Sequence, residues 1–280
     1  MRHRSLRTRP RGGSHRSCRR SSRRPRLRRR ALRRGRPPVT ARQAVVLAAG
    51  RGTRLGALGA DTPKPLLEVG RRPLLFRTLE GLAAAGIERA VIVVGHLRER
   101  VLEALAASPV PGLTVQFVTQ ERLEGTARAV ALARPLLAPG PFLATWGDIF
   151  VEPQNYPRLL AAALPGGGAI LVNPVDDPWA GAAVYIDDAF RVTRIVEKPP
   201  PGTSATNWNN AGPAVLDDWV WPRVERLEPS PRGEYELPRA LAAAVGEGVE
   251  LRAVPVEGPW FDIGTPESLA AARRYAESAP

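Results

Sequence analysis

The chain has 280 residues, of which 44% are hydrophobic, and its formal net charge at pH 7 is +14. The charge is uneven, because residues 1–38 hold 17 of the 41 basic residues and no acidic residue, so residues 39–280 carry 24 basic and 27 acidic groups. This balance excludes a broad nucleic-acid-binding face on residues 39–280, and the single cysteine, Cys18, excludes internal disulfides and cysteine-based metal sites.

Residues 1–38 are rich in arginine and nearly free of apolar side chains, so we predict that they are disordered. Two interpretations stay open: an arginine-rich arm that binds nucleic acid or anionic lipid, or an extension translated upstream of a start at Val39. Ser22-Arg23-Arg24 suggests a twin-arginine export signal, but no apolar segment follows it. No apolar run approaches the length of a membrane span, so we expect a cytoplasmic protein with one domain over residues 39–280.

Strands and helices alternate in the first part of this domain. Residues 43–49 form a short apolar run that ends at a glycine, which is typical of a buried parallel strand. The same patterns predict further strands at 90–94, 113–118 and 141–146, and helices at 73–85, 98–107 and 126–137. This order predicts a doubly wound, mainly parallel sheet, which binds ligands at the carboxyl ends of its strands.

The rhythm changes after residue 165, where short strands dominate. We interpret them as antiparallel additions that cover the first part and complete a pocket. The expected fold class is therefore α/β and Rossmann-like, with a mixed, mainly parallel sheet; no fixed-period repeat or hexapeptide array is present. The strands are predicted at 169–173, 183–186, 192–196, 211–216 and 250–256, and the helices at 237–245 and 265–277.

Lysine is almost absent from the chain, since only two of the 41 basic residues are lysines. Each is followed by proline, in Lys64-Pro65 and Lys198-Pro199. A lysine kept against so strong a preference for arginine indicates a site that needs a compact ammonium charge, which a planar guanidinium cannot replace. We therefore interpret both lysines as anchors of an active site that binds phosphate.

A glycine-rich segment follows the first predicted strand. Its Gly50 and Gly52 let the backbone approach a ligand and direct N–H groups at oxyanions. The neighbouring Arg51, Thr53 and Arg54 add two cations and a hydroxyl donor. The segment matches neither the P-loop pattern nor a complete G-x-G-x-x-G, but a lysine held between two prolines follows it closely. The alternative is a tight turn with surface arginines.

The segment Leu47-Ala-Ala-Gly-Arg-Gly-Thr-Arg-Leu55, followed by Pro63-Lys64-Pro65, resembles the signature of the sugar-1-phosphate nucleotidylyltransferases, the nucleoside-diphosphate-sugar pyrophosphorylases. The resemblance covers about residues 43–275. Segments similar to the family's base-reading, metal-site and sugar-phosphate elements follow in order: Gln120 with Leu123-Glu-Gly-Thr-Ala127, Trp146-Gly-Asp148, Val196-Glu-Lys-Pro199 and Asn210-Ala-Gly212. Two more resemble the glucose-1-phosphate thymidylyl- and uridylyltransferase branch: Gly233-Glu-Tyr-Glu-Leu237 and Trp260-Phe-Asp-Ile-Gly-Thr-Pro266.

The resemblance implies an enzyme that joins an NTP to a hexose-1-phosphate and releases pyrophosphate, with Mg²⁺ as cofactor. UTP or dTTP is favoured over GTP or CTP as the nucleotide. It implies that Arg54, Lys64 and Asp148 are catalytic, and that Asp148 and Asp262 hold the metal ion. It places the sugar phosphate at Gly181, Glu197, Lys198 and Asn210. It places the nucleotide at Leu47, Ala49, Gly50, Arg51, Gly52, Thr53, Arg54, Lys64, Gln120, Gly125 and Thr126.

Several of these residues have a second interpretation. The two aspartates are also suited to capping turns, Glu197 to a solvated surface position, and Gln120 to a polar loop. The chain departs from the family pattern at Trp179-Ala-Gly181, where a tyrosine–glycine pair is usual, and at Gly56-Ala57, where many members have Arg-Pro. Whether Asn209 or Asn210 meets the sugar is open.

Three other functions also stay open. A cytidylyl- or guanylyltransferase would act on phosphocholine, mannose-1-phosphate or a heptose phosphate, although Glu197-Lys-Pro and Asn210-Ala-Gly favour a sugar. A non-catalytic nucleotide-sugar sensor would not need the full set of Lys64, Asp148 and Asp262. The third is nucleic-acid binding through residues 1–38. Apart from that possibility, we expect the protein to bind only its two substrates and not to associate with a membrane.

Overall fold

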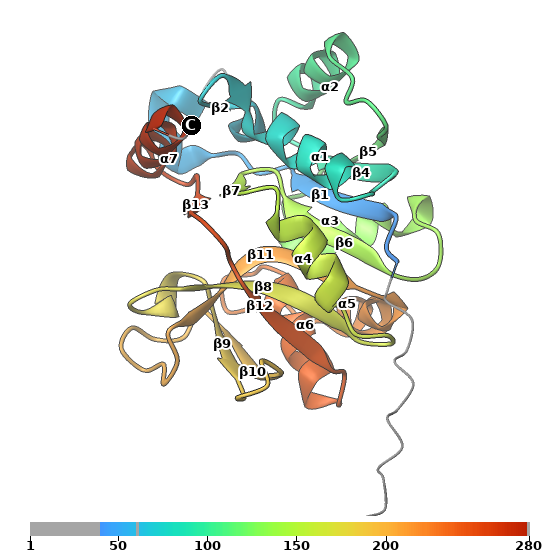
Figure 1. Cartoon of the computed structure of the whole chain (residues 1–280), viewed down its shortest axis with the longest axis vertical. Coiled ribbons are helices and arrows are strands. Elements are labelled where there is room, and N and C mark those ends of the chain that lie inside the picture. The colour runs from blue at the N-terminus through green and yellow to red at the C-terminus, as the bar shows by residue number, and fades with distance from the viewer. Residues whose placement is uncertain (1–39, 60–61, 279–280) are drawn as a thin grey trace, which may run out of the picture. The chain divides into compact units, whose positions relative to one another are not determined.

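The structure, a computed structural model, describes residues 40–59 and 62–278 (Figure 1). The leader predicted at residues 1–38 lies outside the described residues. The main sheet of the described part has the strand order β10-β9-β11-β6-β1-β4-β5, with β8 paired to β11 and β12 paired to β8. Its strands in chain order are β1 (Gln43–Ala48), β4 (Arg89–Val94), β5 (Thr114–Thr119), β6 (Phe142–Trp146), β8 (Gly168–Pro174), β9 (Ala182–Ile186), β10 (Val192–Glu197), β11 (Trp208–Leu216) and β12 (Leu251–Pro255).

One half of the sheet is parallel, as the alternation of strands and helices predicted. Strand β1 is parallel to β4 and to β6, and β4 is parallel to β5. The other half contains antiparallel pairs, of β11 with β6, β8 and β9 and of β9 with β10. The prediction of antiparallel additions is wrong for β12, which is parallel to β8, with Leu251 opposite Gly168 where both strands begin. Helix α6 (Leu237–Gly246) precedes β12, and the Gly168 N–H donates to the Glu250 carbonyl at 3.1 Å, so both strands start at the same end of the sheet.

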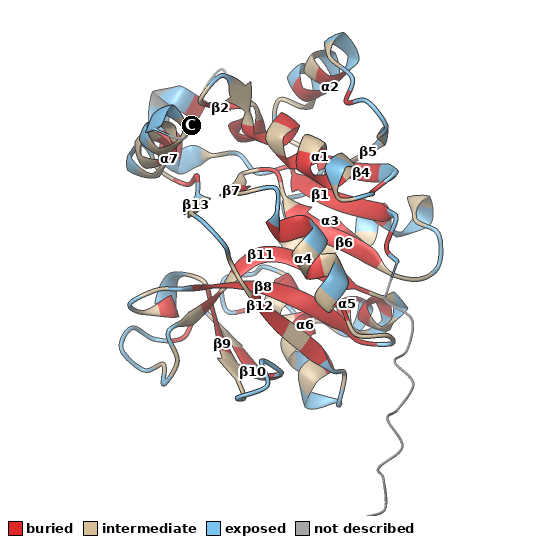
Figure 2. Cartoon of the chain, viewed as in Figure 1, coloured by how far each residue is buried: buried red, intermediate tan, exposed pale blue. Residues whose placement is uncertain are grey.

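Helices cover both faces of the sheet, and each strand supplies alternate side chains to the two faces. On β1, Val45 and Leu47 belong to one apolar cluster, whereas Ala44, Val46 and Ala48 belong to the other. Figure 2 shows the buried strands between helices whose outer sides are exposed. The helices of the first cluster are α3 (Thr126–Ala133), α5 (Trp221–Arg226) and α6, and those of the second are α1 (Leu74–Ala84), α2 (Arg98–Ala107) and α4 (Asn155–Ala162).

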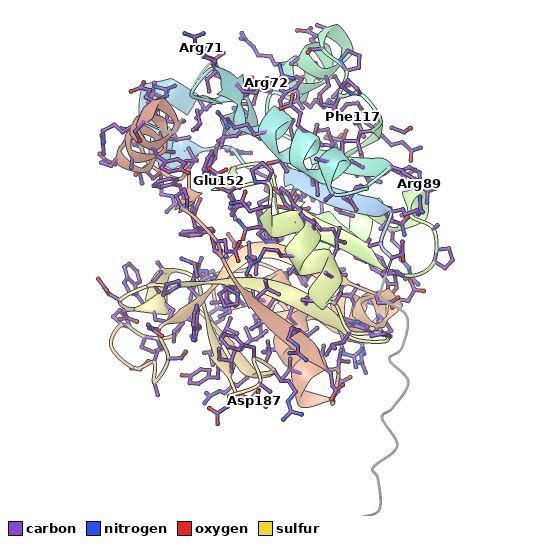
Figure 3. The ribbon with its side chains drawn as sticks, viewed as in Figure 1. Arg71, Arg72, Arg89, Phe117, Glu152 and Asp187 are labelled. Atoms are coloured by element: carbon purple, nitrogen blue, oxygen red, sulfur yellow. The ribbon has the colours of Figure 1, made fainter. Side chains whose placement is uncertain are left out.

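A third apolar cluster joins the C-terminal helix to the loop that follows β1. Leu269 of the helix and Leu55 of the loop are both buried in it. Further along the helix, the Tyr275 hydroxyl donates a hydrogen bond to Glu152, which Figure 3 labels, and this bond raises the pKa of Tyr275. The elements around this cluster are α7 (Pro266–Ser278), β2 (Glu68–Val69), β3 (Arg72–Pro73), β7 (Ile149–Val151), β13 (Trp260–Asp262) and the 3₁₀ segment η1 (Thr53–Gly59).

Three helices differ from the prediction. The helix predicted at 126–137 ends at Ala133 and continues as the 3₁₀ turn η3 (Arg134–Leu136), because Pro135 has no N–H to donate. Helices α4 and α5 are absent from the prediction, since both are short and carry a proline in the first turn, Pro157 and Pro222. None of the described helices is long and apolar enough to span a membrane. The remaining 3₁₀ turns are η2 (Lys64–Leu66), η4 (Pro178–Ala180) and η5 (Asp218–Val220).

Candidate active site

The loop after β1 turns tightly and is anchored by a buried side chain. Leu55 is buried in the cluster shared with α7, and its N–H donates to the Gly52 carbonyl at 2.9 Å. Gly52 has a φ of +63°, in the left-handed region that favours glycine. Gly59 packs so closely that a Cβ on it would lie 3.0 Å from the Gly52 carbonyl oxygen. The loop is therefore held at the carboxyl end of β1, where α/β sheets bind ligands.

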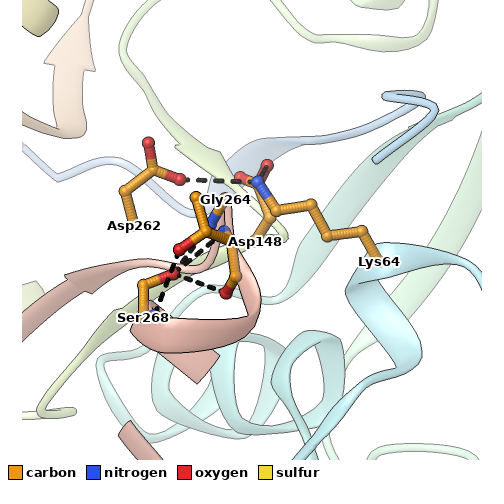
Figure 4. A network of polar contacts seen from close by, with 6 residues as sticks. Lys64, Asp148, Asp262, Gly264 and Ser268 are labelled. Carbon is orange, nitrogen blue, oxygen red and sulfur yellow. Dashed lines mark hydrogen bonds and ion pairs between the residues drawn. The ribbon is translucent and has the colours of Figure 1, made fainter. Parts of the chain in front are cut away.

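Lys64 lies between two carboxylates, as Figure 4 shows. Its side chain is 9% exposed, and Nζ lies 2.6 Å from Oδ2 of Asp148 and 3.4 Å from Oδ1 of Asp262. Pro63 and Pro65 flank Lys64 at the start of η2 and restrict its backbone. The ammonium group is therefore held in one place by both its backbone and its partners.

The two aspartates come from distant parts of the chain. Asp148 follows β6, and Asp262 ends β13, which pairs with β7. The Ile263 N–H donates to the Asp148 carbonyl at 3.1 Å, so this small sheet fixes one aspartate beside the other. The Ser268 hydroxyl, at the start of α7, accepts from the Gly264 N–H at 3.1 Å and holds the turn after Asp262.

The Asp148 carboxyl has a raised pKa. Burial is the largest cause, and the nearby Asp262 carboxylate adds to it, whereas the Lys64 ammonium acts in the opposite direction. Two carboxylates share one ammonium, so the group carries net negative charge when both are ionised. A second cation beside them would relieve the repulsion. Among the described residues, no group of three or more His, Cys, Asp or Glu side chains could hold a metal ion, so a metal here would need phosphate or water ligands as well.

Two adjoining cavities form one cleft around this group. The first, of about 440 Å³, is lined by Lys64 and Asp148 among others, and we call it the Lys64 lobe. The second, of about 380 Å³, is lined by Glu197 and Asp262 among others, and we call it the Glu197 lobe. The cavities adjoin, since five residues line both: Arg54, Thr126, Trp146, Lys198 and Glu234.

Nearly all of the predicted site residues line this cleft. Arg51 does not: it lines a neighbouring hollow, because the tight turn directs its side chain away from the cleft. Gln120 lines both that hollow and the cleft. The Glu197 lobe contains the predicted Gly181, Glu197, Lys198, Asn210 and Asp262. The Lys64 lobe contains the predicted Leu47, Ala49, Gly50, Gly52, Thr53, Arg54, Lys64, Gln120, Gly125, Thr126 and Asp148.

Residues 228–236, which we call the 228–236 loop, are attached to the Lys64 lobe through their backbone. The Tyr235 N–H donates to the Glu124 carbonyl at 2.7 Å, and the Tyr235 carbonyl accepts from the Ala127 N–H at 2.8 Å. Gly125 lies between these bonds with a φ of +108°, and a Cβ on it would lie 2.5 Å from the Tyr235 carbonyl oxygen. Only glycine fits this position without moving the loop.

Gly181 and Lys198 meet through their backbones in the Glu197 lobe. The Lys198 N–H donates to the Gly181 carbonyl at 2.7 Å, and Lys198 has a φ of +43°, which is uncommon for a residue with a side chain. A Cβ on Gly181 would lie 2.1 Å from Oδ1 of Asn209. The Asn209 amide nitrogen donates to Oδ1 of Asn173 at 3.0 Å. Asn209 and Asn210 both line the lobe, so the choice between them stays open.

The sequence profile described as nucleotidyl transferase matches residues 43–279. The chain belongs to this family.

Three curated relatives of this nucleotidyl transferase carry different names. The bifunctional protein GlmU of Methanococcus maripaludis is 28% identical over 83% of this chain and 54% of its own length. The glucose-1-phosphate thymidylyltransferase of Streptomyces antibioticus is 31% identical over 79% of this chain and 62% of its own length. The mannose-1-phosphate guanyltransferase of Schizosaccharomyces pombe is 32% identical over 80% of this chain and 61% of its own length. The chain thus spans little more than half the length of the curated relatives it matches.

Two solved structures share the fold. A UDP-glucose pyrophosphorylase in complex with UDP-glucose has a TM-score of 0.78 at 18% identity, covering 86% of this chain and all of that chain. At that identity the likeness shows the fold alone. A putative glucose-1-phosphate thymidylyltransferase from Bacillus anthracis has a TM-score of 0.75 at 26% identity, covering 85% of this chain and 96% of that chain. The expected α/β fold with a mixed, mainly parallel sheet is confirmed.

The cleft of the nucleotidyl transferase also contains residues that the sequence did not single out. Trp146, Trp260 and Glu236 line the Glu197 lobe, and the Trp260 Nε1–H donates to the Ala211 carbonyl at 2.8 Å. All three stand in segments that resemble family motifs, so their position beside the predicted aspartates and glycines was an available signal. Asp177 also lines the lobe, but its loop carries no pattern that would have identified it.

Proposed function

We propose that this nucleotidyl transferase joins an NTP to a hexose-1-phosphate and releases pyrophosphate, with UTP or dTTP as the favoured nucleotide. The observation that carries the proposal is the position of the Lys64 ammonium between Asp148 and Asp262. This group spans the cleft, because Lys64 and Asp148 line one lobe and Asp262 lines the other. A fixed cation between two cavities suits a reaction that brings two polyanions together.

In the proposed reaction, an oxygen of the sugar 1-phosphate attacks the α-phosphorus of the NTP. A phosphorus–oxygen bond forms there, the bond from the α-phosphorus to the bridging oxygen of the β-phosphate breaks, and pyrophosphate leaves with that electron pair. Lys64 stabilises the charge that grows on the α-phosphate oxygens. Arg54 and the backbone N–H groups of residues 50–53 hold the other phosphates.

The sugar phosphate occupies the Glu197 lobe in this proposal. Lys198 lines both lobes, so its ammonium is placed to bind the phosphate of the sugar. The Glu197 side chain is 11% exposed, and burial raises the pKa of its carboxyl, whereas Lys198 and Arg232 act in the opposite direction. As a carboxylate, Glu197 accepts hydrogen bonds from sugar hydroxyl groups.

We further propose that Asp148 and Asp262 hold Mg²⁺. The pair fits such an ion because both carboxylates already converge on a cation, and because Mg²⁺ prefers a few carboxylate oxygens together with phosphate oxygens. When bound, the ion supplies charge neutralisation for the phosphates. Removal of Mg²⁺ with a chelator should abolish pyrophosphate release, and unchanged release would exclude the ion from the reaction.

A panel assay of the full chain tests the proposed function. Each of the four NTPs is combined with glucose-1-phosphate, mannose-1-phosphate, a heptose phosphate or phosphocholine, and pyrophosphate release is measured with Mg²⁺ present. We expect the highest kcat/KM for UTP or dTTP with a hexose-1-phosphate. A preference for GTP with mannose-1-phosphate would favour the guanylyl reaction of the relative from Schizosaccharomyces pombe. Nucleotide binding without release for any pair would favour a non-catalytic sensor.

A further inference from the structure

The acidic side chains of the Glu197 lobe are unequally paired. Five line the lobe, and three of these form ion pairs: Glu197, Glu236 and Asp262. Within the described residues, the other two, Asp177 and Glu234, form none. Glu234 is exposed, so water solvates its charge, whereas Asp177 is half-buried. Asp177 is therefore the acid of the lobe whose charge has neither a cation nor full solvation.

The Asp177 carboxylate is fixed in place but incompletely satisfied. Its Oδ2 accepts a hydrogen bond from the Gly202 N–H at 2.6 Å, which joins the loop after β8 to the loop after β10. Its Oδ1 is buried and has no hydrogen-bond partner. A buried carboxylate oxygen without a donor is unfavourable. Positive charge brought to this side of the lobe by a ligand would therefore be stabilised there.

A second unpartnered acceptor belongs to the same lobe. The Asn209 side chain is 6% exposed, and its Oδ1 has no hydrogen-bond partner. This oxygen faces Gly181, since a Cβ on that glycine would lie 2.1 Å from it. The amide nitrogen of Asn209 is already engaged, because it donates to Oδ1 of Asn173 and to the Asn210 carbonyl, both at 3.0 Å. At this point the lobe therefore has an acceptor to spare and no donor.

The unpaired charges of the cleft are also separated along it. Arg54 and Lys198 line both lobes, and among the described residues neither forms an ion pair, so both are free to bind phosphate. Asp177 lines the Glu197 lobe alone. The free cations thus lie where the two lobes meet, and the unpaired acid lies away from that junction. This distribution suits a substrate with phosphate at one end and positive charge at the other.

We propose that the Glu197 lobe binds an aminohexose-1-phosphate, with the ammonium group of the sugar beside Asp177 and away from the phosphate on C1. The proposal rests on the function proposed above and names its sugar substrate. A hydroxyl group donates and accepts, whereas an ammonium group only donates, through three N–H bonds. It also supplies the positive charge that Asp177 lacks. The amine belongs on C3, C4 or C6 of the ring, because C2 is the carbon next to the phosphate-bearing C1.

Steady-state pyrophosphate release by the full chain tests the proposal. Glucose-1-phosphate is compared with its 2-, 3-, 4- and 6-amino derivatives, in each of which an amine replaces one hydroxyl group. The assays contain UTP or dTTP and Mg²⁺ at about pH 7, where most of the amine is protonated. We expect a 3-, 4- or 6-amino derivative to exceed glucose-1-phosphate about tenfold in kcat/KM. The gain should lie in KM, because the ammonium contact is present before and during the reaction.

Two variants assign the preference to one residue. Asp177→Asn removes the charge but keeps the shape and an oxygen that can accept from the Gly202 N–H. It should lower kcat/KM for the preferred amino derivative about tenfold more than kcat/KM for glucose-1-phosphate. Asp176→Asn is the matched control, because Asp176 is exposed and does not line the lobe, and this variant should keep the preference. Urea unfolding reports whether each variant is folded.

Several outcomes would overturn the proposal. Wild-type protein might turn over glucose-1-phosphate without preferring any amino derivative, or it might prefer the 2-amino derivative alone. A preference that survives Asp177→Asn would assign it to another group. An equal fall for every sugar would show that Asp177 only joins the two loops. If wild-type protein releases no pyrophosphate with any substrate pair, the proposed function fails, and calorimetric titration of the same sugars into wild-type protein and Asp177→Asn still measures the preference in binding.

Discussion

Lys64 is the residue at which the chemistry of the cleft can be tested most directly. Its ammonium is buried between two carboxylates, whereas the other lysine of the chain, Lys198, is exposed. Substitution of Lys64 therefore removes a positive charge that is held in place, whereas the same substitution of Lys198 removes one on an exposed side chain. This contrast separates stabilisation of the transition state from binding of a substrate.

We expect Lys64→Met to lower kcat by about 10²- to 10³-fold while the KM for NTP changes less than about fivefold, because a fixed charge beside the reacting phosphorus acts on the chemical step. Lys198→Met should raise the KM for sugar-1-phosphate more than it lowers kcat. Steady-state pyrophosphate release measures both. Equal losses of kcat and of NTP affinity in Lys64→Met would mean that this lysine only binds substrate.

The raised pKa of Asp148 predicts a pH dependence of stability. Because the pKa is higher in the folded than in the unfolded chain, the folded state holds this proton more firmly, and the stabilisation is lost as pH rises through the raised value. From about pH 4 upwards, the free energy of unfolding of metal-free wild-type protein should therefore fall more steeply than that of Asp148→Asn. Urea unfolding with a chelator at a series of pH values measures this difference. Curves that run parallel for the two proteins would contradict the prediction.

At the scale of secondary structure, the parallel strands β1, β4 and β6 could be predicted because they are buried on both faces and are therefore largely continuous apolar runs. The direction of β12 could not, since an apolar pattern does not identify the neighbour with which a strand pairs. The helices α4 and α5 were missed because both are short and a proline occupies the first turn of each.

The candidate site was predictable to a similar extent. Most of its residues stand in motifs that resemble a known family, and the structure gathers them in one cleft. Arg51 was placed with the loop residues because it lies among them in the sequence, but the turn directs its side chain into the neighbouring hollow. Asp177 has no such signal, because its loop carries no pattern that resembles a family motif.

The attachment of the 228–236 loop can be tested with two glycines of nearly equal backbone conformation. Gly125 and Gly140 have φ values of +108° and +106°, but a Cβ on Gly125 would lie 2.5 Å from the Tyr235 carbonyl oxygen, whereas nothing lies within 4 Å of one on Gly140. We expect Gly140→Ala to lower the free energy of unfolding by about 1 kcal/mol through backbone strain alone. Gly125→Ala should lower it by about 3 kcal/mol and raise the KM for NTP. Urea unfolding and kinetics measure both effects, and equal losses in the two variants would show that the loop is not held here.

At the scale of the whole chain, the excess of positive charge and the cleft occupy separate stretches of sequence. Residues 1–38 hold 17 arginines, whereas the described residues that line the two lobes lie between Leu47 and Gly264. The larger part of the chain has a slight excess of acidic residues. The positive side chains that line the cleft are therefore local features and do not arise from a generally basic surface.

We expect deletion of residues 1–38 to leave kcat and both KM values within about twofold of those of the full chain. The deletion should also remove salt-dependent binding to RNA and DNA, because the basic residues that would release counterions are lost. Pyrophosphate release and binding titrations at increasing salt measure the two effects. A large fall in turnover would mean that the leader contributes to the site.

The packing of Leu269 on the cluster that contains Leu55 has a consequence for synthesis of the protein. On the ribosome, the loop after β1 and Lys64 emerge long before Asp262 and α7. Until these last segments are released, the apolar side of the loop lacks the part of its cover that α7 supplies, and the Lys64 ammonium has one of its two partners. We therefore expect a nascent chain to gain the ability to bind its substrates in a single late step, when residues 262–278 leave the exit tunnel.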